Sequence, residues 1–197
     1  GEMKGYDVEL TLSDIPVQYR GVANGDLDAM LMSWQPATHS SYIEKYGDQL
    51  VDLGPLYKDA QLGWAVPAYI PKDMLNSVED LKNPEVRAKL NGTVQGIDKD
   101  AGLSGMSRTV IEDYGIDYEI SYGSGPLMAK NLGKAIRNEE WIVVTAWNPH
   151  WIFGKYELRY LEESKGIMEP KEHVNALVRQ GFKQDQPEIA AFFERMH

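Results

Sequence analysis

The sequence contains no cysteine, which excludes disulfide bonds, thiolate metal sites and cysteine nucleophiles. It also lacks long hydrophobic runs: none approaches the roughly 20 residues of a membrane-spanning helix, and no cleavable signal peptide is visible. Positive charge is scarce, because 20 lysines and arginines stand against 30 acidic residues, for a formal net charge of −10. No basic stripe exists to neutralise phosphates, which argues against nucleic acid as a partner.

The common catalytic and metal-binding motifs are missing as well. There is no Gly-x-Ser-x-Gly elbow, no His-Glu-x-x-His and no EF-hand loop. His39 and His150 have no third ligand at a recognisable metal-site spacing. The acidic pairs Glu139-Glu140 and Glu162-Glu163 lie on polar stretches and indicate solvated surfaces. We therefore expect a protein that is not an enzyme and that uses neither a metal ion nor a cofactor.

The most informative feature that is present is a pair of matching strand endings. The segments Ala29–Pro36 and Ile142–Pro149 each consist of a short apolar run followed by Trp-x-Pro. Such a run is typical of a buried strand, and proline ends the strand because it has no N–H to donate. Open α/β sheets bind their ligands at the carboxyl ends of strands. We therefore expect Trp34 and Trp147 to be facing walls of one cleft.

Periodicity along the chain predicts alternating strands and helices, which indicates an α/β fold with mostly parallel sheets. Strands are expected over 6–12, 26–34, 50–53, 62–67, 93–97, 118–122, 141–147 and 173–179. Helices are expected over 15–24, 40–46, from Ser77, and over 98–114, 123–137 and 187–196. The predicted division is a first lobe from residues 1–67, a second lobe from 68–172 and a return to the first lobe over 173–197.

The tryptophans admit two interpretations. Trp is the best aromatic partner for a quaternary ammonium group, because the face of its ring attracts a cation that cannot donate hydrogen bonds. Large aromatics also pack into cores wherever they occur. For Trp64 and Trp141, in the middle or at the start of a strand, core packing is expected. For Trp34 and Trp147, the position at a strand end before a proline favours contact with a ligand.

Two further features could hold the anionic part of a ligand. His39 follows Trp34 by five residues and could donate to a carboxylate; taken alone, an exposed histidine capping the helix near Ser40 is the favoured interpretation. The loop 96–105 joins a strand to a helix, and free N–H groups at a helix start bind carboxylate or phosphate. A purely structural helix start is equally compatible, and the spacing fits neither the Rossmann fingerprint nor the P-loop.

Three segments taken together resemble the glycine betaine-binding proteins of ABC transporters, of the OpuAC/ProX type. They are Ser33–His39, Gly96–Leu103 and Trp147–Trp151. The resemblance covers nearly the whole chain and includes the segments 23–29, 52–54, 78–81, 143–145, 160–162 and 178–182. Each motif is weak by itself, but as a set they are specific.

The resemblance implies a type II periplasmic-binding-protein fold, in which two α/β lobes joined by a two-strand hinge close over a zwitterion. Trp34 and Trp147 would be walls of an aromatic cage around the trimethylammonium group. The carboxylate would accept hydrogen bonds from His39 and from the backbone N–H groups of Gly102 and Leu103. Further cage walls could come from Trp151 or Tyr122. The first lobe would lack the strand and helix with which the family begins.

The implied function is that of the solute-binding component of an ABC importer, which takes up an osmoprotectant outside the cytoplasm and delivers it to a membrane permease. A choline- or carnitine-binding protein of the same fold is the first alternative. An enzyme acting on a small acid, with His39 or His150 as general base, is a second. A sugar-binding protein that stacks pyranose rings on tryptophan is a third, although few polar side chains flank Trp34 and Trp147.

Overall fold

The computed structural model describes residues 5–168 and 171–196, and the chain divides into two compact units. Unit 1 is made of the described residues of Gly1–Ser33, His39–Leu56 and Val174–His197, and unit 2 of those of Trp34–Thr38 and Tyr57–His173. The division from the sequence differs from this at three places: residues 34–38, residues 57–67 and His173 group with the second unit. The strand β2 (Leu50–Pro67) runs from unit 1 into unit 2, so the division falls within one continuous strand.

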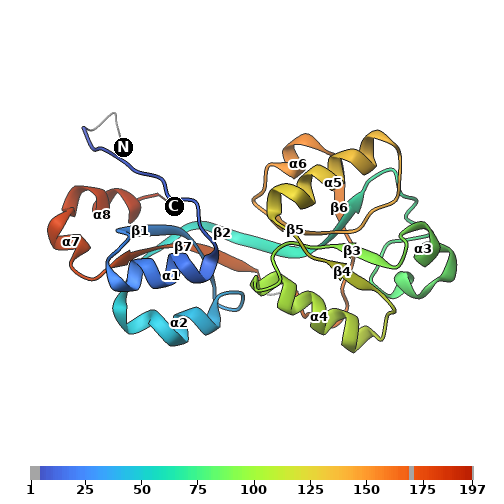
Figure 1. Ribbon diagram of the computed structural model, residues 1–197, viewed down its shortest axis with the longest axis horizontal. Coiled ribbons are helices and arrows are strands. Elements are labelled where there is room, and N and C mark those ends of the chain that lie inside the picture. Colours follow the sequence, from blue (N-terminus) through green and yellow to red (C-terminus); the bar gives the residue numbers. More distant parts are fainter. Residues whose placement is uncertain (1–4, 169–170, 197) are drawn as a thin grey trace. The chain divides into compact units, whose positions relative to one another are not determined.

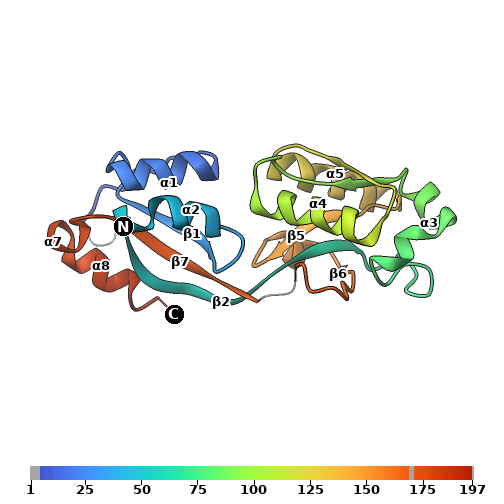
Figure 2. The same ribbon diagram turned by 90° about the horizontal axis from the view of Figure 1, so that it is seen from below.

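Unit 1 is a sheet with helices on both faces (Figures 1 and 2). The strand order is β1-β7-β2, and β2 continues into unit 2. The elements are the strands β1 (Ala29–Gln35), β2 (Leu50–Pro67) and β7 (Glu172–Arg179), the 3-10 helix η2 (Gly47–Gln49), and the helices α1 (Ile15–Asn24), α2 (Ser40–Tyr46), α7 (Phe182–Asp185) and α8 (Pro187–Phe193).

The two faces of this sheet are filled by alternate residues of the same strands. On β7, Leu177 packs with Tyr19 and Val22 of α1, whereas Ala176 and Val178 pack with α7 and α8 on the opposite side. Successive side chains of a strand point to opposite faces. Both sides of the sheet are therefore covered, and the middle of β7 is buried without interruption from Val174 to Val178.

Unit 2 has a mixed sheet. β2 is antiparallel to β5 and to β6, whereas β3 is parallel to β4 and to β5. The predicted α/β class is confirmed, but the sheet is mixed rather than mostly parallel. Its elements are the strands β3 (Thr93–Gln95), β4 (Glu119–Ser121), β5 (Val144–Asn148) and β6 (Leu158–Tyr160), the 3-10 helix η3 (Glu79–Lys82), and the helices α3 (Pro84–Lys89), α4 (Gly102–Tyr114), α5 (Gly125–Arg137) and α6 (Ile152–Lys155).

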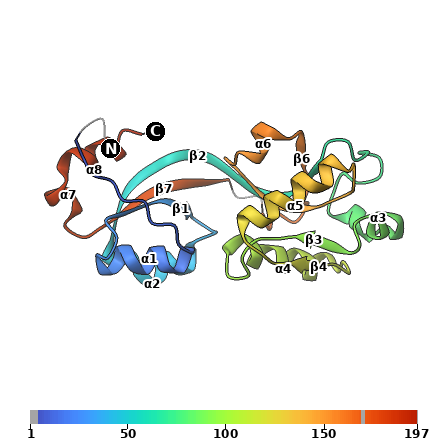
Figure 3. The same cartoon turned by 45° about the horizontal axis from the view of Figure 1, so that its top comes forward.

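Helices α5 and α6 cover one face of this sheet and α4 covers the other (Figure 3). Met128 and Ile152 from the first pair pack on Ala65 of β2. The next residue back, Trp64, points the opposite way: its indole N–H donates to Ser107 Oγ of α4 at 2.9 Å, and only 2% of Trp64 is exposed. Trp64 is thus a core residue, as expected.

Two predicted helices have the bounds that the sequence indicates, Ile15–Asn24 and Ser40–Tyr46. The first ends where Gly25 adopts a φ of 81°, a left-handed conformation that glycine takes at little cost. The strand expected over 6–12 is wrong. That segment has no regular structure, and Leu10 and Leu12 are almost fully exposed, so its alternation does not reflect burial against a sheet.

The helix expected from Ser77 is also wrong. The chain forms only the four-residue 3-10 helix η3 before the separate helix α3. The carboxylate of Asp80 accepts hydrogen bonds from the backbone N–H groups of Asn76 and Ser77, both at 2.8 Å. These bonds stabilise a local turn in competition with an α-helix.

Candidate functional site

The two Trp-x-Pro motifs end strands, as predicted. Trp34 and Trp147 are each the last residue but one of β1 and β5, and the proline that follows is in cis in both cases. Trp34 is buried, with 6% of its surface exposed, and Trp147 is half-buried. The equivalent positions predicted for the two indoles are confirmed, but their surroundings differ.

The turn after Trp34 is held by a carboxylate that the sequence analysis did not single out. Glu172 Oε2 accepts hydrogen bonds from the backbone N–H groups of Ala37, at 3.2 Å, and Thr38, at 3.0 Å. The hydroxyl of Thr38 donates to the other oxygen, Oε1. Glu172 is 1% exposed. A buried carboxylate is costly unless it accepts hydrogen bonds, so these contacts fix the turn and stabilise the charge together.

The start of α4 lies against the same turn. A Cβ added to Gly102 would stand 2.6 Å from Thr38 Cγ2 and closer still to the Thr38 carbonyl oxygen. Only glycine allows this approach. Two segments far apart in the sequence, the turn after Trp34 and the loop before α4, are thereby brought together within unit 2.

The first residues of α4 present unused hydrogen-bond donors. Gly102 and Leu103 open the helix, and their N–H groups have no intrahelical acceptor, as at any helix start. Within the part of the chain that the structure describes, no other group accepts from them, and Ala101 provides no side-chain cap. The helix is 13 residues long, so its dipole favours a negative charge at this end.

His39 is buried in unit 1, with 4% of its surface exposed. The exposed capping histidine that the sequence alone favours is therefore wrong, although His39 does precede the first residue of α2. Its Nδ1 lies 3.1 Å from the hydroxyl of Tyr19, which in turn lies 2.7 Å from Ser33 Oγ. Burial lowers the pKa of His39 to about 4, so the ring is neutral at pH 7.

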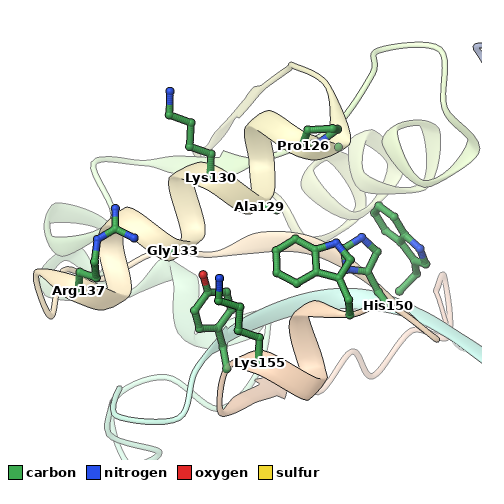
Figure 4. Close-up of a pocket in the computed structure, with 11 residues that line it drawn as sticks. Pro126, Ala129, Lys130, Gly133, Arg137, His150 and Lys155 are labelled. Carbon is green, nitrogen blue, oxygen red and sulfur yellow. The ribbon is translucent and has the colours of Figure 1, made fainter. Parts of the chain in front are cut away.

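Trp147 also forms part of a pocket of about 510 Å³ in unit 2, between α5 and α6 (Figure 4). The imidazole of His150 lies edge-on to Trp147 at 4.4 Å and next to Trp151 at 5.6 Å, between ring centroids. Trp151 is 56% exposed. The pocket is lined by Gly125, Pro126, Ala129, Lys130, Gly133, Arg137, Trp147, His150, Trp151, Lys155 and Tyr156.

Of the two additional cage residues suggested by the sequence, one lines the same pocket as Trp147. Trp151 shares the pocket with it, whereas Tyr122 does not line that pocket. The Tyr122 hydroxyl instead lies 3.2 Å from an Arg108 guanidinium nitrogen. Burial lowers the pKa of His150 as it does that of His39.

The interpretation of Glu162-Glu163 as a solvated pair is wrong for Glu163, which is 8% exposed. Its carboxylate accepts from the hydroxyl of Tyr114, at 2.5 Å, and from the backbone N–H groups of Lys165, Ile167 and Met168. These hydrogen bonds lower its pKa despite the opposing effect of desolvation. Glu163 is thus a structural carboxylate that organises the turn after it.

Among residues 5–168 and 171–196, no group of three or more histidine or acidic side chains could hold a metal ion. No helix in the same ranges is long and apolar enough to cross a bilayer.

Comparison with known families decides the assignment. The model of OpuAC, the substrate-binding domain of ABC-type glycine betaine transport systems, matches residues 1–197. The chain belongs to the OpuAC family. The resemblance seen in the sequence and the type II periplasmic-binding-protein fold that it implied are both confirmed. OpuAC is a family of transport proteins rather than of enzymes, and its members bind a small substrate and act with an ABC transporter.

Individual members of the family and solved structures agree with this assignment. Lactococcal OpuAC, solved closed and complexed with glycine betaine, is 37% identical over 100% of this chain and 75% of its own, with a TM-score of 0.88. ProX from Borrelia burgdorferi is 31% identical over 100% and 73%, with a TM-score of 0.87. The glycine betaine/carnitine transport binding protein GbuC of Listeria monocytogenes is 35% identical over 102 residues, which span 50% of this chain and 34% of GbuC.

Proposed function

We propose that this OpuAC-family chain binds glycine betaine, or a closely related quaternary-ammonium zwitterion, outside the cytoplasm and delivers it to an ABC transporter permease. The observation that supports this most directly is the arrangement in unit 2. The turn that follows Trp34 packs on the first residue of α4, whose N–H groups are available to an anion. A cation-binding aromatic and an anion-binding helix start are the two elements that a zwitterion needs.

In this proposal, the indoles of Trp34 and Trp147 contact the trimethylammonium group, with Trp151 as an additional wall. The ligand carboxylate accepts hydrogen bonds from the N–H groups of Gly102 and Leu103 and from His39. A neutral histidine can donate from one ring nitrogen, so the low pKa of His39 is compatible with this role. Each charge of the zwitterion is then compensated, which burial requires.

The test is a titration of the protein with glycine betaine followed by tryptophan fluorescence and by calorimetry, with choline as the comparison ligand. We expect saturable binding of betaine that weakens at least about tenfold in Trp147→Ala. Trp141→Ala is the matched control, because it removes an indole that lies under Lys89, 5.1 Å from the ring centroid, and before the start of β5. Tighter binding of choline than of betaine would favour the choline alternative, and absence of both would reject the proposal.

A further inference from the structure

The hydroxyl of Tyr19 is the centre of a buried hydrogen-bond chain in unit 1. Tyr19 and Ser33 are each 0% exposed, and His39 is 4% exposed. The Tyr19 oxygen lies 2.7 Å from Ser33 Oγ and 3.1 Å from His39 Nδ1. The Tyr19 ring is also stacked on Tyr42, with centroids 4.9 Å apart. The phenol is therefore held in place by packing as well as by its two polar neighbours.

A tyrosine hydroxyl has one hydrogen, so Tyr19 can donate to only one of these neighbours. In one direction, Ser33 donates to Tyr19 and Tyr19 donates to Nδ1, which leaves the imidazole proton on Nε2. In the other, Nδ1–H donates to Tyr19 and Tyr19 donates to Ser33, which leaves Nε2 as an acceptor. Only the first direction gives His39 an Nε2–H that can donate to a carboxylate.

We propose that Tyr19 is a positioning residue for ligand binding: it donates to His39 Nδ1, with Ser33 behind it, and so keeps the imidazole proton on Nε2. The inference rests on the proposed role of His39 as a donor to the ligand carboxylate. Tyr19 itself does not touch the ligand in this account. It acts by setting the tautomer and the ring orientation of the residue that does.

The hydrogen-bond chain from Ser33 through Tyr19 to His39 also bears on which ligand groups can bind. A carboxylate has only acceptor oxygens when ionised, so it stabilises the direction that ends in Nε2–H. A ligand hydroxyl in the same place could accept from Nε2–H or donate to Nε2, so either direction would serve it. In the reverse direction Ser33 is the group that accepts from Tyr19. Removing the Ser33 hydroxyl therefore disfavours the reverse direction. The substitution Ser33→Ala should therefore leave betaine affinity within about threefold of the parent.

The direct test is the nitrogen NMR spectrum of the histidine rings in the full chain, with the His39 signals assigned by comparison with His39→Gln. We expect a neutral ring with the proton on Nε2 and a hydrogen-bonded, unprotonated Nδ1, both without ligand and with saturating glycine betaine. A proton on Nδ1 in the betaine-bound protein would overturn the proposal. This readout does not depend on any variant of Tyr19 being folded. It also separates the proposal from its premise: if betaine does not bind, the proposed function fails, whereas the tautomer is still measured.

The second test is a double-mutant cycle on betaine affinity. Tyr19→Phe keeps the ring and removes the hydroxyl, and we expect it to weaken binding about tenfold. In the His39→Gln background the same change should have almost no further effect, since Tyr19 acts only through His39. Equal effects in both backgrounds would show a general structural role and contradict the proposal. Tyr46→Phe is the matched control, because Tyr46 packs against the same apolar cluster and should change affinity less than twofold.

Discussion

The two Trp-x-Pro strand ends have nearly the same local sequence but different tertiary environments. After Trp34, the turn is fixed by three hydrogen bonds to the buried carboxylate of Glu172. After Trp147, the chain continues into His150 and the exposed Trp151, along the edge of a pocket. One tryptophan is thus attached to an anchored turn and the other to an open surface. The comparison shows that a strand-end motif locates an indole, whereas distant residues decide how firmly its surroundings are held.

The largest expected effect comes from removing the anchor on the Trp34 side. Glu172→Ala would leave the buried N–H groups of Ala37 and Thr38 without an acceptor, and we expect it to lower the free energy of unfolding by about 4 kcal/mol. Urea unfolding measures this loss. Glu172→Gln, which keeps an acceptor oxygen, is the control and should cost about 1 kcal/mol. Equal losses in the two variants would mean that packing rather than hydrogen bonding holds the turn.

The histidines that follow the two Trp-x-Pro motifs, His39 and His150, should contribute differently to the pH dependence of native stability. Burial lowers the pKa of His39 from 6.5 to about 4, so between these values the unfolded chain binds a proton that the native chain does not. Native stability therefore falls as the pH drops from about 6.5 to about 4, by about 3 kcal/mol at most. His39→Gln should remove most of this slope, and His150→Gln should remove less. A slope that is unchanged in His39→Gln would place the responsible group elsewhere.

The close contact between the turn after Trp34 and α4 can be disrupted by adding a single methyl group at Gly102. In Gly102→Ala, the new Cβ would meet the Thr38 carbonyl, and we expect a loss of about 2 kcal/mol in unfolding free energy together with weaker betaine binding. Gly105→Ala is the matched control in the same helix, because its Cβ would meet only Arg108, at 3.6 Å. That variant should be neutral or slightly stabilising. The pair is compared by urea unfolding and calorimetric titration.

The smallest expected effect on betaine binding comes from Trp151, on the exposed surface that follows Trp147. Trp151 is largely exposed, and as an additional wall it should contribute less to binding than Trp147 does. We expect Trp151→Ala to weaken betaine binding by about fivefold or less, with Trp151→Phe closer to the parent. Calorimetric titration of both variants measures this. A loss as large as that of Trp147→Ala would make Trp151 a principal wall of the cage.

The parts of the fold that could be predicted from the sequence are those set by residues that start or end helices and strands locally. Gly25 ends α1, Ser124 caps α5 by accepting from the N–H of Leu127, and a proline follows each tryptophan strand end. The strand directions could not be predicted, because they depend on which strands pair across the sheet. The segment 6–12 was predicted as a strand from its alternation alone, but among the described residues it pairs with no strand and Leu10 and Leu12 are exposed.

The candidate site was predictable to the same extent. The sequence located both indoles and the start of α4, because each stands at a strand or helix boundary. It missed the residues that hold His39 and the turn in place. Glu172 contacts Thr38 from 134 positions away, and Tyr19 contacts His39 across 20. Glu172 stands out in the sequence as the acidic residue at the start of the strand 172–179. Nothing in the sequence indicates, however, that its partner is Thr38.

The long sequence separation between Glu172 and Thr38 also bears on the order in which parts of the protein fold during synthesis. A ribosome releases the chain from its N-terminus, so the turn after Trp34 exists long before the carboxylate that holds it has been made. Contacts between such distant residues close late, because the chain between them must first be ordered. The aromatic end of β1 therefore acquires its final form only when β7 has been made, and a nascent protein interrupted before β7 has the indole without the geometry to use it.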